Sequence, residues 1–242
     1  MSGPYQSFIR NLEQRDELTS QERALIESLP ANMRSFERGE ELVVENSRPN
    51  HSCLLLSGFA GREIILRDGK RQIAAVNIPG DFVDLHAMLL KVMDHTVVAL
   101  TPCRAAFVPH EDLRRVVAES LHLGRLLWLM TVIDAAIHRA WIASIGRRHA
   151  GARVGHLVCE LFLRLQAVGL SEPNRLDFPV TQSELADMLG LSVVHVNRSL
   201  RELREKNLLV WRGNKIEIPD FAALSGACGF EPTYLNLHKE PR

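Results

Sequence analysis

The alternation of apolar and polar positions is most regular in residues 181–218, TQSELADMLGLSVVHVNRSLRELREKNLLVWRGNKIEI. Thr181 followed three positions later by Glu184 is a capping-box pattern, which predicts the start of a helix. The apolar face of that helix repeats at helical spacing through Leu185, Ala186 and Leu189. Gly190 and Leu191 then predict a short turn, since glycine readily adopts the left-handed conformation that ends helices.

A second helix is predicted from Ser192, a favoured N-cap residue. Its inward stripe consists of Val196, Leu200 and Leu203. Its outward face carries short, polar or cationic side chains, namely Val194, His195, Asn197, Arg198 and Arg201. The runs LLVWR and KIEI follow, joined by Gly213-Asn214, a hairpin signal. The pattern predicts a helix-turn-helix with a small β-wing.

This arrangement suits double-stranded DNA, because the second helix can enter the major groove while the first crosses the backbone. Arg198 is placed for a bidentate contact to guanine and Val194 for a thymine methyl. Ser192, His195 and the amides around Thr181 are candidates for phosphate contacts. The predicted DNA-binding set is Thr181, Gln182, Ser183, Ser192, Val193, Val194, His195, Asn197, Arg198 and Arg201. The alternative is a ligand-binding or scaffolding protein whose helix-turn-helix contacts protein.

The first half of the chain has a different pattern of apolar and polar residues. Residues 19–29 form a short amphipathic pattern ended by Pro30. Residues 33–108 hold short alternating runs separated by glycines and polar turns, which predicts a β-sandwich or barrel. The run DFVDLHAMLLKV at 81–92 interrupts them as a short helix.

Residues 110–145 are predicted to form one long helix with a heptad-like seam. The sequence leaves two packing partners possible for this seam. The helix can pack against its own barrel or against a second subunit, and the width of its apolar surface suggests both. The predicted dimerisation residues are Leu126, Met130, Ile133, Ile137 and Ala140. Gly146 to Gly151 breaks the pattern. The expected domains are therefore 1–109, the dimerisation helix and hinge 110–146, and 147–242.

Composition adds few constraints. The 242 residues have zero net charge, with net −2 before residue 147 and net +2 from there on. The start of the chain is polar and no apolar run approaches the roughly 20 residues of a membrane helix, so a cytoplasmic protein without a membrane partner is expected. The four cysteines have no C-x-x-C spacing and favour buried thiols over structural zinc. No nucleophile–base signature, phosphate-binding glycine loop or metal pair suggests an enzyme.

The order of barrel, long helix, hinge and winged helix-turn-helix resembles the Crp–Fnr family of bacterial transcription regulators. The resemblance covers about residues 19–218 and rests on RGEELVVEN, LLLSGFAG, DGKRQIAAVNIPGDFV, the GAR at 151–153 and the helix-turn-helix itself. It implies an α+β protein with an N-terminal cyclic-nucleotide-binding-type jelly roll that senses an effector. It also implies a homodimer on a two-fold symmetric DNA site, with RNA polymerase as a partner if the protein is an activator.

Departures from the family pattern concern the effector. In cyclic-AMP-binding members a glycine-glutamate pair holds the ribose and an arginine-serine pair holds the phosphate. Here the stretch that corresponds to the first pair reads Val83-Asp84-Leu85-His86, and the later pair appears as His95-Thr96. Without the arginine the phosphate loses its bidentate partner, so we expect this barrel not to bind cyclic AMP in the usual way. An Fnr-type iron–sulfur cluster is not expected, because residues 1–30 contain no cysteine.

No cofactor is predicted, while haem or another small effector stays open. The effector-pocket candidates are Asp84, Leu85, His86, His95, Thr96, His138 and Arg139. Many relatives have a glutamate where Val194 stands, which predicts a different half-site at one base pair. The sequence does not distinguish an activator from a repressor.

Overall fold

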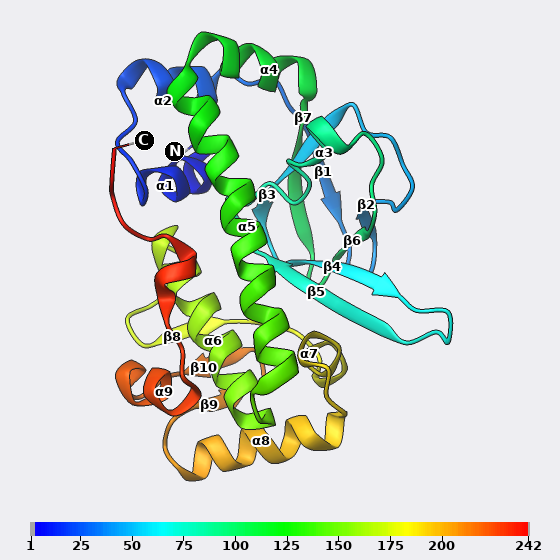
Figure 1. Ribbon diagram of the computed structural model, residues 1–242, viewed down its shortest axis with the longest axis vertical. Helices are drawn as coiled ribbons and strands as arrows, with labels where there is room; N and C mark the ends of the chain where they lie inside the picture. The colour runs from blue at the N-terminus through cyan, green and yellow to red at the C-terminus, as the bar shows by residue number, and fades with distance from the viewer. Residues whose placement is uncertain (1–2, 242) are drawn as a thin grey trace. The chain divides into compact units, whose positions relative to one another are not determined.

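The computed structural model describes residues 3–241, which divide into two compact units (Figure 1). Within the described residues, the first unit comprises 3–64, 75–135 and 237–241. The second comprises 65–74 and 136–236.

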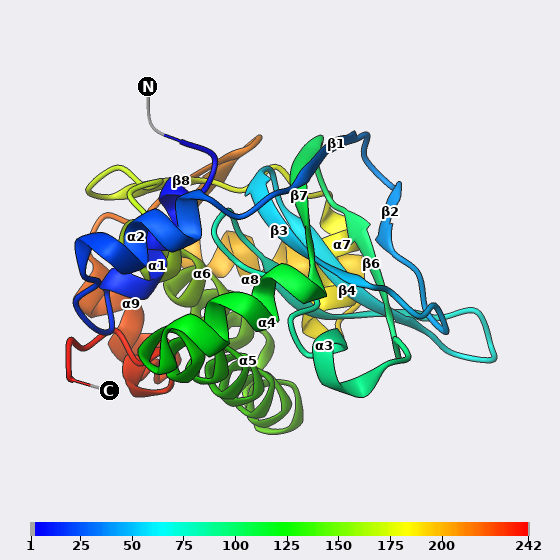
Figure 2. The same ribbon diagram turned by 90° about the horizontal axis from the view of Figure 1, so that it is seen from above.

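The sheets of the N-terminal half form a β-sandwich, as the alternating runs predict. A three-stranded sheet has the order β1-β7-β3, seen side by side in Figure 2, and a four-stranded sheet has the order β2-β6-β4-β5. The strands are β1 (Asn32–Phe36), β2 (Glu41–Val43), β3 (His51–Ser57), β4 (Ala60–Ile65), β5 (Arg71–Asn77), β6 (Thr96–Ala99) and β7 (Cys103–Pro109). Both sheets contribute to one core, which contains Phe36, Leu55 and Phe107 beside Val43, Ala60 and Val97.

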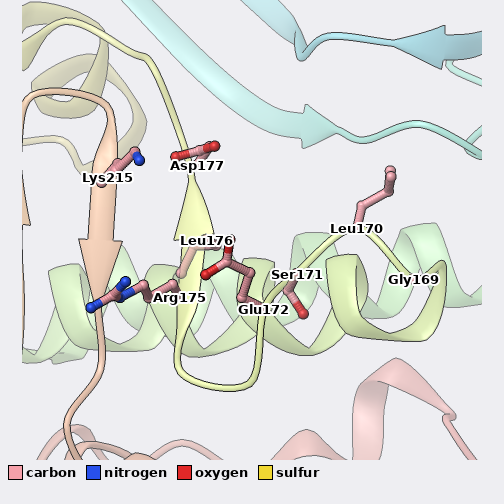
Figure 3. Close-up of a pocket in the computed structure, with 8 residues that line it drawn as sticks. All are labelled: Gly169, Leu170, Ser171, Glu172, Arg175, Leu176, Asp177 and Lys215. Atoms are coloured by element: carbon pink, nitrogen blue, oxygen red, sulfur yellow. The ribbon is translucent and has the colours of Figure 1, made fainter.

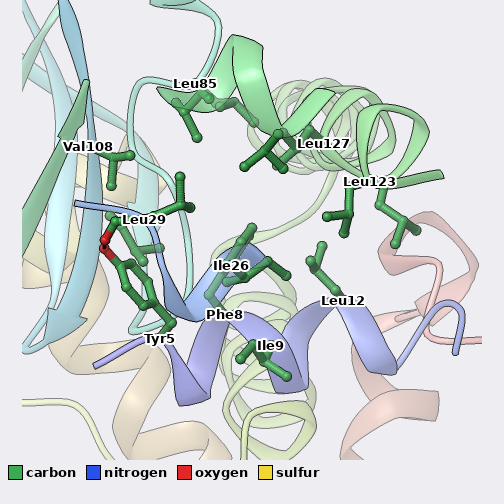
Figure 4. Close-up of a cluster of buried hydrophobic side chains, with 14 of the residues drawn as sticks. Tyr5, Phe8, Ile9, Leu12, Ile26, Leu29, Leu85, Val108, Leu123 and Leu127 are labelled. Atoms are coloured by element: carbon green, nitrogen blue, oxygen red, sulfur yellow. Dashed lines mark hydrogen bonds between the residues drawn. The ribbon is translucent and has the colours of Figure 1, made fainter. Parts of the chain in front are cut away.

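A second core of the first unit lies under its helices. These are α1 (Gln6–Glu13), α2 (Ser20–Glu27), α3 (Ala87–Leu90), α4 (His110–Glu119) and the first turns of α5 (Leu121–Arg147). Figure 4 shows Phe8, Ile9 and Leu12 of α1 pointing into this cluster, where each is at most 3% exposed. The hydroxyl of Tyr5 donates to the carbonyl of Leu29 at 2.7 Å.

The helix α1 was not predicted, since its overall polarity hides the spacing of Phe8, Ile9 and Leu12. The predicted single helix 110–145 is also corrected, because Ser120 is extended (φ −137°, ψ 106°) and separates α4 from α5. The Ser120 hydroxyl caps α5 by accepting from the amide of Leu123 at 3.1 Å. At the other end α5 continues through Gly146 to Arg147, beyond the predicted break.

The second unit contains the helix-turn-helix. Its elements are α6 (Ala150–Ala167), β8 (Arg175–Asp177), α7 (Gln182–Leu189), α8 (Val193–Glu205), β9 (Val210–Arg212), β10 (Lys215–Glu217), α9 (Phe221–Cys228) and the 3₁₀ helix η1 (Pro232–Leu235). The predicted wing is the hairpin β9–β10, with Gly213 at φ 57° in its turn. The strand β8 completes a sheet of order β8-β10-β9 and was not predicted.

A buried carboxylate organises the core of this unit. Glu160 of α6 is 0% exposed and accepts hydrogen bonds from Trp141 Nε1 and from the hydroxyl of Tyr234 at 2.8 Å. Arg164 Nη1 lies 3.3 Å from its Oε1. Burial raises the pKa of Glu160, and the Arg164 charge opposes that rise. The end of α5, α6 and η1 are thereby joined through one side chain.

Two further expectations have a clear outcome. All four cysteines are buried, as predicted. The expectation about membrane segments was too strict, because α5 is long and apolar enough to cross a membrane, with a mean hydropathy of 1.4. One such helix is weak evidence for a membrane span, since the core helix of a soluble protein satisfies the same criteria.

Candidate functional site

The first helix of the helix-turn-helix begins at the predicted capping box. The amide of Glu184 donates to the Thr181 hydroxyl at 3.1 Å, and the amide of Thr181 donates to Glu184 Oε2 at 2.6 Å. A phosphate contact through the Thr181 amide would have to break that bond, so this part of the predicted contact set is revised. The amides of Gln182 and Ser183 belong to the first turn of α7, where N–H groups point out of a helix toward anions.

The turn that follows has the predicted geometry. Gly190 lies at φ 60°, ψ 42°, in the left-handed region. Arg153 of α6, which the sequence reasoning missed, donates from Nη1 to the carbonyl of Leu189 at 3.0 Å. A guanidinium at a helix C-terminus also interacts favourably with the helix dipole. The GAR at 151–153 was the available signal.

The second helix, α8, presents the predicted face. Ser192 caps it by accepting from the amide of His195 at 3.3 Å. Val196, Ser199 and Leu203 are buried, whereas Leu200 is only partly buried. The exposed face contains the predicted DNA-binding residues of this helix and its cap, Ser192, Val193, Val194, His195, Asn197, Arg198 and Arg201.

The two arginines of this face each have a glutamate one turn away. Arg198 Nε lies 3.6 Å from Glu202 Oε1, and Arg201 Nε lies 4.0 Å from Glu205 Oε1. All four side chains are at least half exposed. Exposed pairs of this kind are worth about 0.3–0.5 kcal/mol, so a phosphate or a guanine can displace the glutamates at little cost.

In the first unit, the effector candidates do not all line one site. Asp84 is 1% exposed and its Oδ1 accepts from the Cys53 amide at 2.6 Å; burial raises the pKa of this carboxyl to about 7. Leu85 packs into the apolar cluster of Figure 4, so it is corrected to a core residue. The hydroxyl of Thr96 accepts from the Glu45 amide at 3.2 Å.

His86 and His95 do come together. Their ring centroids are 5.3 Å apart, and His95 Nδ1 lies 2.7 Å from Asp94 Oδ1. Burial and the nearby Arg62 charge lower the pKa of His86 to about 4, and the same causes lower the pKa of His95. Both rings are therefore neutral near pH 7.

Arg62 of β4 also belongs to this region, and sequence reasoning did not select it. It is 4% exposed, and its Nε and Nη2 donate to the carbonyl of Val83. Its Nη1 forms a salt bridge of 2.6 Å with Asp134 of α5. All three Arg62 nitrogens are therefore engaged within the protein, and the carboxyl of Asp84 is buried nearby. The expectation about cyclic AMP stays a prediction.

The remaining pocket candidates, His138 and Arg139, belong to the second unit. They stay a prediction, since the two units are described separately.

The predicted dimerisation seam stays a prediction, but most of it is already buried within one chain. Leu126, Ile133 and Ile137 are 0%, 5% and 7% exposed within a single chain, so they have almost no surface left for a second copy. Met130 and Ala140 are partly buried. The exposed large apolar residues of α5 lie on another face of the helix and are Leu121, Trp128, Val132 and Ile142. They follow one another at 7, 4 and 10 positions, close to whole numbers of helical turns.

A pocket of the second unit is lined by the β8 turn and β10 (Figure 3). Acidic and basic side chains mix there, namely Glu172, Arg175, Asp177 and Lys215. This mixture favours no polyanion, and we assign the pocket no part in DNA binding.

Comparisons with known proteins agree with this layout. A family profile described as a cyclic nucleotide-binding domain matches residues 33–120, and one described as a Crp-like helix-turn-helix domain matches residues 152–227. The chain is 26% identical over 215 residues to the transcriptional activator protein FnrL of Cereibacter sphaeroides, covering 87% of this chain and 85% of that protein. It is 24% identical over 174 residues to the nitrogen fixation regulation protein FixK of Azorhizobium caulinodans, covering 72% and 69%.

Solved structures show the same fold. The structure of FixK2 from Bradyrhizobium japonicum matches with a TM-score of 0.73 at 23% identity, covering 82% of this chain and 97% of that one. CprK in complex with OCPA matches with a TM-score of 0.57 at 17% identity, covering 86% and 91%.

Proposed function

The chain belongs to the Crp–Fnr family of transcription regulators, and from that premise we propose how it reads DNA. Two copies bind a two-fold symmetric duplex, each placing α8 in the major groove. The exposed face of α8, with Arg198 at its centre, is the observation that carries this proposal. A solely structural helix would not need this polar and cationic face.

We propose that the dimer forms along the exposed face of α5. Leu121 is 74% exposed, Trp128 71% and Ile142 71%, which is unusual for large apolar side chains on one helix face. A second copy of the same helix would bury them, as in other two-stranded helical seams.

We further propose that the protein is cytoplasmic, acts without catalysis and does not respond to cyclic AMP. Activation through RNA polymerase is the proposed mode, supported by the similarity to FnrL, which is a transcriptional activator protein. The effector-sensing part is the β-sandwich unit, whose region around His86 and His95 is the candidate sensor.

Selection of bound sequences from random duplex DNA tests the proposal. We expect an inverted repeat, because a two-fold symmetric dimer reads two equivalent half-sites. Affinity for the selected duplex should fall steeply with salt, since bound phosphates release counterions. Calorimetry at millimolar cyclic AMP should show no binding heat. Failure to enrich any sequence, with salt-independent binding, would contradict the DNA-binding role.

A further inference from the structure

The loop between β5 and β6 brings together two imidazoles and a carboxylate. His86 immediately precedes α3, and Asp94 and His95 immediately precede β6. One potential ligand atom from each of the three residues lies within 4.8 Å of the others. His95 is 9% exposed, whereas Asp94 is open to solvent.

The hydrogen bond of His95 fixes which of its ring nitrogens carries the lone pair. A carboxylate only accepts, so the contact of 2.7 Å between Asp94 Oδ1 and His95 Nδ1 places the ring proton of neutral His95 on Nδ1. Its Nε2 then carries a lone pair. Among residues 3–241, neither His95 Nε2 nor His86 Nε2 has a hydrogen-bond partner, although both atoms are buried. Buried polar atoms are usually satisfied, so a ligand for both nitrogens is the natural explanation.

We propose that His86 and His95 bind a divalent transition-metal ion of the zinc class through Nε2, with Asp94 orienting His95. Neutral imidazole is the common protein ligand for such ions. A carboxylate on the second ring nitrogen is the usual way in which a ligating histidine is oriented and made more basic. The positions not filled by imidazole are left for water or a small ligand.

The surrounding charges permit a cation at this place. Arg62 is the nearby positive charge, and its Nη1 is paired with Asp134 at 2.6 Å. Asp94 adds a second negative charge beside the rings. Two carboxylates therefore oppose one guanidinium around the two neutral rings, and the environment is not repulsive for a divalent ion.

The site is connected to α5 through Arg62 and Asp134. The effect on DNA binding that we infer from this connection rests on the proposed function. Arg62 lies beside both histidines and holds Asp134 of α5. An ion bound between the rings would repel the Arg62 guanidinium and change its bond to the dimerisation helix. The metal ion is thus an effector that alters the affinity of the dimer for DNA.

Titration of the full-length protein with Zn²⁺ after treatment with a chelator tests the site. Calorimetry is expected to give one ion per chain, and Co²⁺ should give the absorption spectrum of a nitrogen-bound ion. His86→Ala and His95→Ala should each weaken binding more than tenfold, and Asp94→Ala by about 10–100-fold. The control His238→Ala removes an exposed histidine outside the cluster and should bind Zn²⁺ as the parent protein does.

Because His95 is buried, circular dichroism should first show that each variant is folded. Asp94 is exposed, so Asp94→Ala tests the site without disturbing the core. Equal Zn²⁺ binding by the folded parent and the folded His86→Ala protein would overturn the site, and so would absence of stoichiometric binding by the parent. DNA affinity is measured separately with and without Zn²⁺. Equal DNA affinity with and without bound Zn²⁺ would refute the effector role. Absence of DNA binding under both conditions would refute the proposed function, and the metal site would still be decided by the titration.

Discussion

Arg198 and Arg201 lie on the same exposed face of α8 but have different expected partners. Arg198 is in the second turn, where side chains reach base edges, whereas Arg201 is one turn further along the helix. A bidentate contact to guanine discriminates by about 1–3 kcal/mol, but a phosphate contact carries no sequence information.

We therefore expect Arg198→Ala to lose about 1–3 kcal/mol of binding to the selected duplex, with little loss on unrelated DNA. Arg201→Ala should weaken both about equally and lower the salt slope by about one. Fluorescence anisotropy at several salt concentrations measures this. Glu202→Gln is the control, because it frees Arg198 from its neighbour and should not reduce affinity. Unchanged discrimination in Arg198→Ala would remove this residue from base readout.

Glu22 gives a prediction about acid stability. Burial would raise its pKa, but hydrogen bonds from the Thr19 backbone, Ser120 and His122 outweigh burial and lower the pKa from 4.5 to about 2. A lowered pKa stabilises the folded state above pH 4.5, and this stabilisation is lost as the pH falls toward 2.

Glu22→Gln should thus cost about 1–3 kcal/mol of unfolding free energy at pH 7 and almost nothing near pH 2. Urea unfolding across this pH range measures the difference. Glutamine keeps the shape needed at the third helical position, so a pH-independent cost would indicate a packing effect instead.

At the scale of elements, the helix-turn-helix depends on one backbone conformation. Gly190 lies at φ 60°, which costs a side-chain-bearing residue about 1–2 kcal/mol. A Cβ there would meet its nearest atom, Ile145 Cγ2, at 3.4 Å, so conformation and not crowding sets the cost.

Gly190→Ala should accordingly destabilise the protein by about 1–2 kcal/mol. The matched control is Gly146→Ala within α5, where a Cβ meets nothing within 4 Å and alanine should stabilise the helix by about 0.5–1 kcal/mol. Thermal unfolding of both variants compares them directly. Shifts of opposite sign are expected, and destabilisation by both variants would contradict the assignment of the cost to the backbone conformation of Gly190.

The elements that could be predicted from the sequence are those with a local signal. The capping box at Thr181, the turn at Gly190 and the wing at Gly213 each depend on neighbours within a few residues. The helix α1 and the strand β8 were missed because tertiary packing, not propensity, stabilises them.

The candidate site was predictable to a similar extent. The exposed face of α8 follows from helical periodicity, whereas the pairing of Arg62 with Asp134 joins positions 72 residues apart. No periodic pattern reports such a contact. The same limit applies to the predicted seam on α5: the spacing of apolar residues identifies helix faces but does not say which face the protomer itself covers.

At the scale of the whole molecule, the assembly can be tested on α5. Val132→Glu on the exposed face should place a charge in the dimer interface and give monomers in sedimentation, with a large loss of DNA affinity. Leu89→Glu is the control, since Leu89 is 83% exposed on α3. Ile137→Glu, in the buried stripe, should destabilise the chain itself. A Val132→Glu protein that remains dimeric would place the interface elsewhere.

The last residues of the chain have a consequence for dissecting the protein. Residues 237–241 belong to the first unit, where the amide of Glu240 donates to the carbonyl of Arg15 at 2.9 Å. Residues of the first unit therefore lie both before and after those of the second unit in the sequence. No single cleavage of the chain separates the two units. A truncated protein ending near residue 135 would lack this closing segment, and a tag fused at the C-terminus would follow a segment that is bonded to the N-terminal residues of the same unit.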